Sequence, residues 1–202
     1  MGLLNLLKAN FTGKVGQMVG AKWKNKSTIR SYTKPAYTNT PAQQTVRAGF
    51  GEVTSFVALF ADQIRSLSAL DTKGMSVRNA IIKLNKEMIS AGSLTPDNLM
   101  VSRGGLPNVN GFTATIPTGR TEIKATWTAA TGATISEKAR IVVIAADQDN
   151  NFAAVGSALN SLGTLSIQAT VPAGANLHVY YYLLDYRGSS RVASMSSYKS
   201  VT

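Results

Sequence analysis

The sequence of 202 residues contains no cysteine and a single histidine. Without cysteine it has no disulfide framework, no thiol nucleophile and no thiolate ligand for a metal ion. One histidine leaves no multi-histidine metal site and removes nearly every catalytic triad that uses an imidazole base. The ten acidic residues are scattered along the chain and form no obvious catalytic pair. We therefore expect a protein that is not an enzyme, with no catalytic residues, no metal site and no cofactor.

Long apolar runs and targeting signals are also missing. No run approaches the roughly 18 apolar residues that a transmembrane helix needs. The apolar stretch Met1–Leu7 has neither the basic region before it nor the cleavage site after it that a signal peptide would have. With 44% hydrophobic residues, 17 glycines and six prolines, the composition suits neither a disordered nor a fibrous chain. We expect a folded protein without a signal peptide or a membrane span.

Acidic residues are absent from the first quarter of the chain, although the net charge of the whole is +11. The basic residues between Met1 and Gly51 are Lys8, Lys14, Lys22, Lys24, Lys26, Arg30, Lys34 and Arg47. The rest of the chain is nearly neutral. A basic segment attached to such a body suits a polyanionic partner: nucleic acid, an anionic membrane surface or an acidic patch on another protein.

Residues 1–39 show the pattern of a strand. The apolar residues Val19, Ala21 and Trp23 alternate with glycine and lysine, and this period of two predicts a half-buried strand. A turn at Asn25-Lys26 would return the chain in a second strand with its basic residues outward. We therefore expect a short basic hairpin or arm.

Cations and aromatic residues interleave in this segment, as they do in proteins that bind single-stranded nucleic acid. Cations on one open face would neutralise phosphates. The alternative is that Trp23 belongs to a core and that the lysines only solvate the outer face of a strand. The residues predicted to contact nucleic acid or a partner are Lys14, Lys22, Lys24, Lys26, Arg30 and Lys34.

Residues 40–98 have a helical pattern. Thr40-Pro41-Ala42-Gln43 is a helix start with an N-cap, a proline at the first helical position and a glutamine placed for a capping box. Apolar residues then recur at spacings of three and four up to about Ala69, which predicts one long helix. The apolar positions are Val46, Phe50, Val53, Phe56, Val57, Phe60, Ile64 and Leu67. A second helix from near Ser76 to Gly92 would complete an antiparallel helical hairpin.

Residues 99–202 have an all-β pattern. The expected strands are Gly111–Ile116, Glu122–Thr128, Lys138–Ala146, Thr164–Val171, Leu177–Asp185 and Arg191–Met195. Turn residues separate them. This spacing, with a central Trp127 and a late tyrosine-rich strand, is typical of an immunoglobulin- or fibronectin-like sandwich. The predicted fold class is α+β: a basic N-terminal β-hairpin or arm (1–39), an antiparallel two-helix segment (40–98) and a C-terminal antiparallel β-sandwich (99–202).

Three motifs imitate known sites but lack one requirement of each. The segment Asp147–Asn151 begins like a calcium loop, but Phe152 stands where such a loop needs glycine, so we predict a polar hairpin turn. His178 lacks a second metal ligand and lies on the same strand face as Tyr180, so we predict a packing or hydrogen-bonding residue. The glycines at 13, 16 and 20 do not match the spacing of a phosphate-binding loop.

In their order, these motifs resemble a family of small uncharacterised proteins from Bacteroidota genomes and their bacteriophages. The matching segments are Gly13-Lys14-Val15-Gly16, Gly20-x-Lys22-Trp23-Lys24, Arg30-Ser31, Thr40–Gln44 leading to Arg47 and Phe50, the Trp127 strand, Tyr180–Tyr182, Gly188 and Ser196–Tyr198. The family supplies no catalytic residues. Its association with phage genomes implies a virion component, located in the virion or in the host cytoplasm.

The sequence therefore leads to the hypothesis of a non-enzymatic structural component of a virion or phage-like particle, such as a capsid, capsid-associated or head/tail protein. Its expected partners are copies of itself, other particle proteins, and DNA at the basic segment. One alternative is a non-specific nucleic-acid-binding protein, whose binding would fall steeply with salt. Another is a surface adhesion module, which would need a secretion route. Assembly that depends on concentration without nucleic acid would favour the structural hypothesis.

Overall fold

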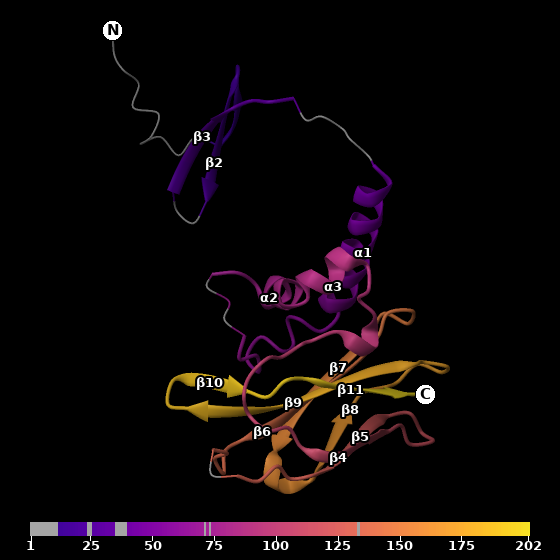
Figure 1. The fold of residues 1–202 in the computed structure, drawn as a ribbon. Coiled ribbons are helices and arrows are strands. Elements are labelled where there is room, and N and C mark those ends of the chain that lie inside the picture. Colours follow the sequence, from indigo (N-terminus) through magenta and orange to yellow (C-terminus); the bar gives the residue numbers. More distant parts are fainter. Residues whose placement is uncertain (1–11, 24–25, 35–39, 71, 73, 133) are drawn as a thin grey trace. The chain divides into compact units, whose positions relative to one another are not determined.

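The computed structural model describes residues 12–23, 26–34, 40–70, 72, 74–132 and 134–202. The chain divides into two compact units, Met1–Thr40 and Pro41–Thr202. Both units are rich in antiparallel strands, and the helices belong to the second (Figure 1).

The first unit contains a three-stranded antiparallel sheet in the order β1-β2-β3. Its strands are β1 (Gly13–Val15), β2 (Met18–Trp23) and β3 (Lys26–Ser31). The predicted hairpin is confirmed as β2–β3, in which Trp23 pairs with Lys26 across the turn. The short strand β1 was not expected, and it adds a third strand along the other edge of β2.

The expectation that β2 buries an apolar face is wrong for Ala21. This residue is exposed and Val19 is half-buried, while the side chain of Trp23 lies outside what the structure describes. Every buried hydrophobic side chain among the described residues lies at Phe56 or later in the chain. A single layer of three short strands has no second layer to cover either face. The alternation along β2 therefore showed correctly which residues share a face. It could not show whether either face is buried.

The second unit begins with a helix that starts where the sequence predicted but ends earlier. Helix α1 spans Pro41–Ala58. Residues 59–67 continue as turns, in which some backbone bonds reach back three residues (Leu67 N–H to Ile64 O, 2.9 Å) and others four (Ile64 N–H to Phe60 O, 3.2 Å). With this mixture of hydrogen-bond spacings, residues 59–67 form no regular helix, yet Phe60 and Ile64 remain buried. The prediction of one helix to Ala69 is thus wrong, although its apolar period holds.

The second predicted helix is present in two pieces. Helices α2 (Val77–Leu84) and α3 (Lys86–Ala91) are separated by Asn85. The Ser76 hydroxyl accepts a hydrogen bond from the N–H of Asn79 (3.2 Å), and Gly92 ends α3 in the left-handed conformation at φ 65°, so both predicted ends are confirmed.

Two antiparallel sheets make up the rest of the second unit. Their strands are β4 (Asn110–Thr115), β5 (Glu122–Thr128), β6 (Arg140–Asp147), β7 (Phe152–Leu159), β8 (Thr164–Gln168), β9 (Leu177–Arg187), β10 (Ser190–Ala193) and β11 (Ser197–Val201). One sheet has the order β4-β5-β8, and the other β10-β9-β6-β7 with β11 also paired to β9. Short 3₁₀ turns lie at Pro96–Asn98 and Asn160–Leu162.

The five-stranded sheet is covered on both faces. Along β6, Ile141 and Val143 pack in a core shared with β4, β5 and β8, whereas Val142 and Ile144 pack in a second core shared with the helical segment. Figure 1 shows α1–α3 on one side of this sheet and β4 and β5 on the other. A strand buried on both faces needs a continuous apolar run rather than an alternating one, and residues 141–146 supply it.

Strands β7 and β11 were not predicted, and for β7 the reason is that its sequence carries little strand propensity. Residues 152–159 of β7 are rich in alanine and contain Gly156, and both residue types are depleted in strands. The glycine is required by close packing: a Cβ at Gly156 would lie 2.6 Å from Cγ1 of Ile167 on β8. The pairing partners of β7, not its own residues, therefore make it a strand.

The α+β class is confirmed, and the β-rich architecture fits a β-sandwich. The segments 41–98 and 99–202 lie in one unit and share the core that contains Phe60 and Tyr180. Among the described helices, none combines the length and the apolar character that a membrane crossing requires.

Candidate functional site

The strand register of the N-terminal sheet brings two of the predicted contact residues together. Lys14 on β1 and Arg30 on β3 both pair with Val19 on the central strand. Directly paired residues of an antiparallel sheet point to the same face, so the two cations flank Val19 on one face. Two strand spacings separate their backbones, roughly 10 Å. Both side chains are exposed, and the sequence has no acid between Met1 and Gly51 to neutralise them.

An aromatic ring completes this face. The Nζ of Lys14 lies 3.7 Å from the centroid of the Tyr32 ring, a cation–π contact. Tyr32 is held just beyond β3 by its N–H, which donates to the carbonyl oxygen of Gln17 (2.7 Å). The ring is 43% exposed, so part of it stays open for stacking. A surface hollow here is lined by Lys14, Val19, Arg30, Ser31, Tyr32 and Thr33. We call this set the Lys14–Arg30 face.

The other predicted contact residues lie elsewhere. Lys26 is on the same face as Arg30, four residues along β3, at the opposite end of the sheet. Lys22 pairs with Ser27 and points to the reverse face. Lys34 is exposed and follows β3 outside any strand. Lys24 lies outside the described residues. The alternation in the sequence could assign faces within β2 and β3, but the position of Lys14 depended on the unpredicted strand β1.

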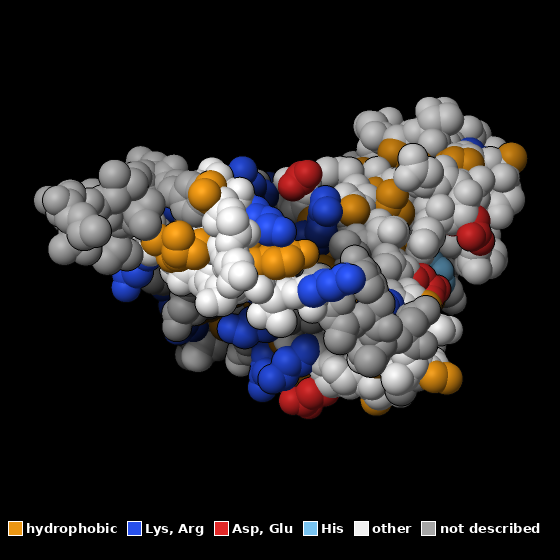
Figure 2. All heavy atoms as spheres, turned by 90° about the horizontal axis from the view of Figure 1, so that it is seen from above, with side chains coloured by type: hydrophobic (Ala, Val, Ile, Leu, Met, Phe, Trp, Pro, Cys, Tyr) orange, Lys and Arg blue, Asp and Glu red, His pale blue; other side chains and the backbone are white. Residues whose placement is uncertain are grey.

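The reverse face of the same sheet carries apolar side chains at one end, beyond Lys22. Val15 pairs with Met18 across β1 and β2, and Ile29 lies on this face of β3 opposite Gly20. Val15 is 59% exposed and Met18 is 42% exposed. Exposed large apolar side chains that share a face commonly mark a contact surface. In Figure 2, both Lys or Arg side chains and hydrophobic ones reach the surface.

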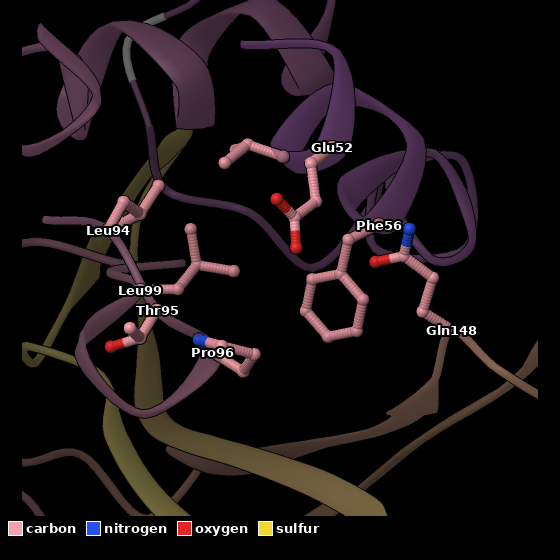
Figure 3. A pocket seen from close by; sticks show the side chains of 8 residues that line it. Glu52, Phe56, Leu94, Thr95, Pro96, Leu99 and Gln148 are labelled. Atoms are coloured by element: carbon pink, nitrogen blue, oxygen red, sulfur yellow. The ribbon is translucent and has the colours of Figure 1, made fainter. Parts of the chain in front are cut away.

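A small apolar pocket lies in the second unit, between α1, the segment 94–99 and the turn after β6. Its lining residues are Glu52, Val53, Phe56, Leu94, Thr95, Pro96, Leu99 and Gln148. In Figure 3 the Glu52 carboxylate and the Phe56 ring, both from α1, point toward Leu99 across the pocket. Glu52 is the one titratable residue among those that line it.

His178 is a packing and hydrogen-bonding residue, as predicted. Its Nδ1 lies 2.9 Å from the hydroxyl oxygen of Tyr198, and the edge of its ring meets Phe56 at a centroid distance of 5.8 Å. Burial lowers the pKa of His178, while the charges of Asp147, Asp149 and Asp97 oppose that shift. Within the described part of the chain, no three His, Asp or Glu side chains gather as metal ligands would.

The segment Asp147–Asn151 forms the turn between β6 and β7, as predicted. The Asp147 carboxylate accepts hydrogen bonds from the N–H of Asp149 (2.9 Å), the side-chain amide of Asn150 (2.8 Å) and the N–H of Asn176 (2.9 Å). Burial alone would raise the pKa of this carboxyl, but the hydrogen bonds together hold its pKa below the usual range. Its oxygens thus serve the turn and the neighbouring loop.

We expect Asp147→Asn to lower the free energy of unfolding at pH 7 by about 1–3 kcal/mol. The asparagine amide would place an NH2 donor where one carboxylate oxygen of Asp147 now accepts hydrogen bonds, so a neighbouring N–H would lose its acceptor. A depressed pKa in the folded state stabilises the protein above the unfolded-state pKa, and this contribution is lost as the pH falls through the folded-state pKa. The difference between wild type and variant should therefore shrink below about pH 4. Urea denaturation along a pH series measures it. Asp149→Asn, at an exposed position of the same turn, is the control; a deficit that stays constant down to acid pH would contradict the assignment.

Comparison with known proteins places the chain in a family. Residues 10–198 match the model of a family of unknown function (DUF6266). Because the match covers nearly the whole chain, the protein belongs to this family. No curated protein and no solved structure matches the chain.

Proposed function

We propose that this protein is a non-enzymatic structural component of a virion or phage-like particle, and that its N-terminal sheet contacts nucleic acid or a neighbouring subunit. One observation carries the proposal: the described residues of the N-terminal sheet expose cations, with Lys14 and Arg30 on one face and Lys22 on the other, beside the exposed apolar side chains of Val15 and Met18. The second unit, by contrast, has two extensive cores of its own. A second unit with its own cores, joined to a small sheet that has no buried hydrophobic side chain among its described residues, suits a subunit that completes its packing in an assembly.

The same proposal assigns the two sheets of the second unit to the fibronectin-like type of sandwich. Trp127 lies in the core between them, and its indole N–H donates to the carbonyl oxygen of Asn160 (2.9 Å). Such a domain would provide a rigid body for repeated contacts, while its fold alone assigns no function.

Sedimentation velocity over a range of protein concentrations, without nucleic acid, tests the proposal. We expect discrete oligomers that persist in high salt, because apolar contacts resist screening. The double variant Val15→Ser/Met18→Ser removes the apolar face of the sheet and should shift the protein toward monomer. Leu162→Ser, at a residue that is 61% exposed in the second unit, is the matched control. A wild-type protein that stays monomeric at every concentration would overturn the structural proposal.

The second candidate function is non-specific binding of single-stranded nucleic acid, favoured by the contact between Lys14 and Tyr32. A cation beside an exposed ring provides both phosphate neutralisation and base stacking, the two elements of sequence-independent binding. Affinity that falls steeply with salt, measured by fluorescence anisotropy with a labelled oligothymidylate, would support this candidate. Absence of binding at low salt would exclude it.

A further inference from the structure

A second group of cations lies in the second unit, at the junction of α2 and α3. Lys83 from α2, Lys86 from α3 and Arg103 from the segment before β4 line one open hollow. All three side chains are exposed. Glu87 is the one acidic residue among those that line the hollow, so the hollow carries a positive net charge. Like charges collected in a concave surface attract a counter-ion more strongly than the same charges spread over a convex one.

A buried asparagine ties together the segments that carry these cations. Asn85 is fully buried, and its Nδ2 donates to the carbonyl oxygens of Ile81 and Met100 (2.8 Å each). In return its Oδ1 accepts from the N–H of Met100 (2.9 Å). The helix junction is therefore tied directly to the segment that carries Arg103, and the two lysines lie on either side of the tie. Such a frame fixes the backbone from which the three cations extend.

The segment that carries Arg103 is also anchored on its other side. The Ser102 hydroxyl donates to the carbonyl oxygen of Ser194 (2.9 Å), and the N–H of Val101 donates to the Ser196 hydroxyl (3.0 Å). Gly104 packs so closely that a Cβ there would lie 1.9 Å from the carbonyl oxygen of Ala193. These contacts place Met195, which also lines the hollow, at a fixed position beside the cations.

Apolar side chains line the same hollow beside the cations. They include Leu70, Leu84, Met100 and Met195, and Met195 is 55% exposed. Methionine and leucine give an adaptable surface for a flat ring, and methionine sulfur makes favourable contacts with aromatic rings. Cations and thioethers that line one hollow match a ligand with an anionic group and an aromatic part.

We propose that this hollow binds a nucleotide unit, with its phosphate at Lys83, Lys86 and Arg103 and its base against Met100 and Met195. The nucleotide can be free or part of a single-stranded nucleic acid, since both present the same two groups. The site lies within the second unit and does not depend on the function proposed for the N-terminal sheet. In an assembly it would give nucleic acid a second point of attachment on each subunit.

Amide chemical shifts of the full-length protein test the site, because they report where a ligand binds. The probes are adenosine monophosphate and a short oligothymidylate, added separately. Binding in the hollow should shift the amide signals of Asn85, Met100 and Arg103. Shifts with both probes support a site that takes free nucleotides, and shifts with the oligonucleotide alone support a site for nucleic acid. If neither probe moves these signals, the proposal is overturned.

Charge-matched variants separate this site from general electrostatic attraction. The double variant Lys83→Gln/Lys86→Gln removes two cations from the hollow and should weaken binding at these amides about tenfold at low salt. Lys138→Gln/Lys199→Gln removes two exposed cations that do not line the hollow, and should leave the shifts nearly unchanged. Equal weakening by both double variants would contradict the proposal. Because all four lysines are exposed, the amide spectra without ligand should show an intact fold for both variants.

Discussion

Reversing the charge at Lys14 and Arg30 together is expected to weaken the binding of a polyanion to the protein by at least about tenfold at low salt. The two side chains are the paired cations of one sheet face, on either side of Val19. No acid in the first 51 residues offsets them, so Lys14→Glu/Arg30→Glu changes this face from basic to acidic. Lys14 also lies over the Tyr32 ring, and its replacement removes the cation–π interaction. Fluorescence anisotropy with labelled oligothymidylate measures the effect.

The matched control is Lys138→Glu/Lys199→Glu, which makes the same change in net charge in the second unit at two exposed residues. The control should weaken binding by much less, because it leaves the Lys14–Arg30 face intact. The dependence of affinity on salt should also become shallower for the sheet variant, by about one unit of log–log slope for each phosphate that the protein no longer neutralises. If both double variants weaken binding equally, the sheet face is not the contact surface.

The second large effect is expected on stability. Phe60→Ala should lower the free energy of unfolding by about 3–5 kcal/mol, as the truncation of a buried phenylalanine does. Phe60 is fully buried, with its ring 5.8 Å from that of Phe56 and 6.3 Å from that of Tyr180 on β9. The cavity would therefore open between the helical segment and the five-stranded sheet. Urea denaturation followed by circular dichroism measures the change.

Phe50→Ala provides the control for this prediction. Phe50 belongs to the same apolar stripe of α1, but it is 48% exposed. Its truncation should therefore change stability by less than about 1 kcal/mol. If the two variants lose equal stability, the helical segment does not share its core with the sheet in the way that we describe.

Burial of the five-stranded sheet on both faces could be predicted from the sequence of some strands but not of others. Residues 141–146 form an apolar run without polar interruption, which is the signal of a strand covered on both faces. The run was assigned to a strand, but the layer of helices over it was not foreseen. Strand β7 escaped prediction because its alanines and Gly156 fit the close approach of Ile167, a requirement that exists only once the sheets are packed.

The helical periodicity likewise predicted which side of α1 is apolar, but not how far along the helix that side is buried. Val46 and Phe50 continue the stripe of Phe56 and Phe60, yet they are 43% and 48% exposed. A period of 3.6 residues identifies which side of a helix is apolar, whereas burial depends on what lies opposite. The break at Asn85 was not predicted either, because its cause is a pair of hydrogen bonds with Met100, fifteen residues away in the chain.

The candidate site, too, could be predicted from the sequence only in part. The excess of cations was visible in composition, and alternation placed Lys26 and Arg30 on one side of β3. The partnership of Lys14 with Arg30 required the register of three strands, and its contact with Tyr32 required the turn that returns Tyr32 to Gln17. Charge patterns in a sequence thus indicated the kind of partner, while only the strand pairing indicated which residues act together.

Light scattering after size exclusion, at low and high salt and with and without single-stranded DNA, tests the central claim most directly. The account predicts discrete oligomers of the wild-type protein without DNA, which persist in high salt. It also predicts that DNA associates with them at low salt, and does so at least about tenfold more weakly with Lys14→Glu/Arg30→Glu. A protein that is monomeric in every condition, with DNA binding unaffected by that variant, would contradict both the structural role and the assignment of the N-terminal sheet as its contact surface.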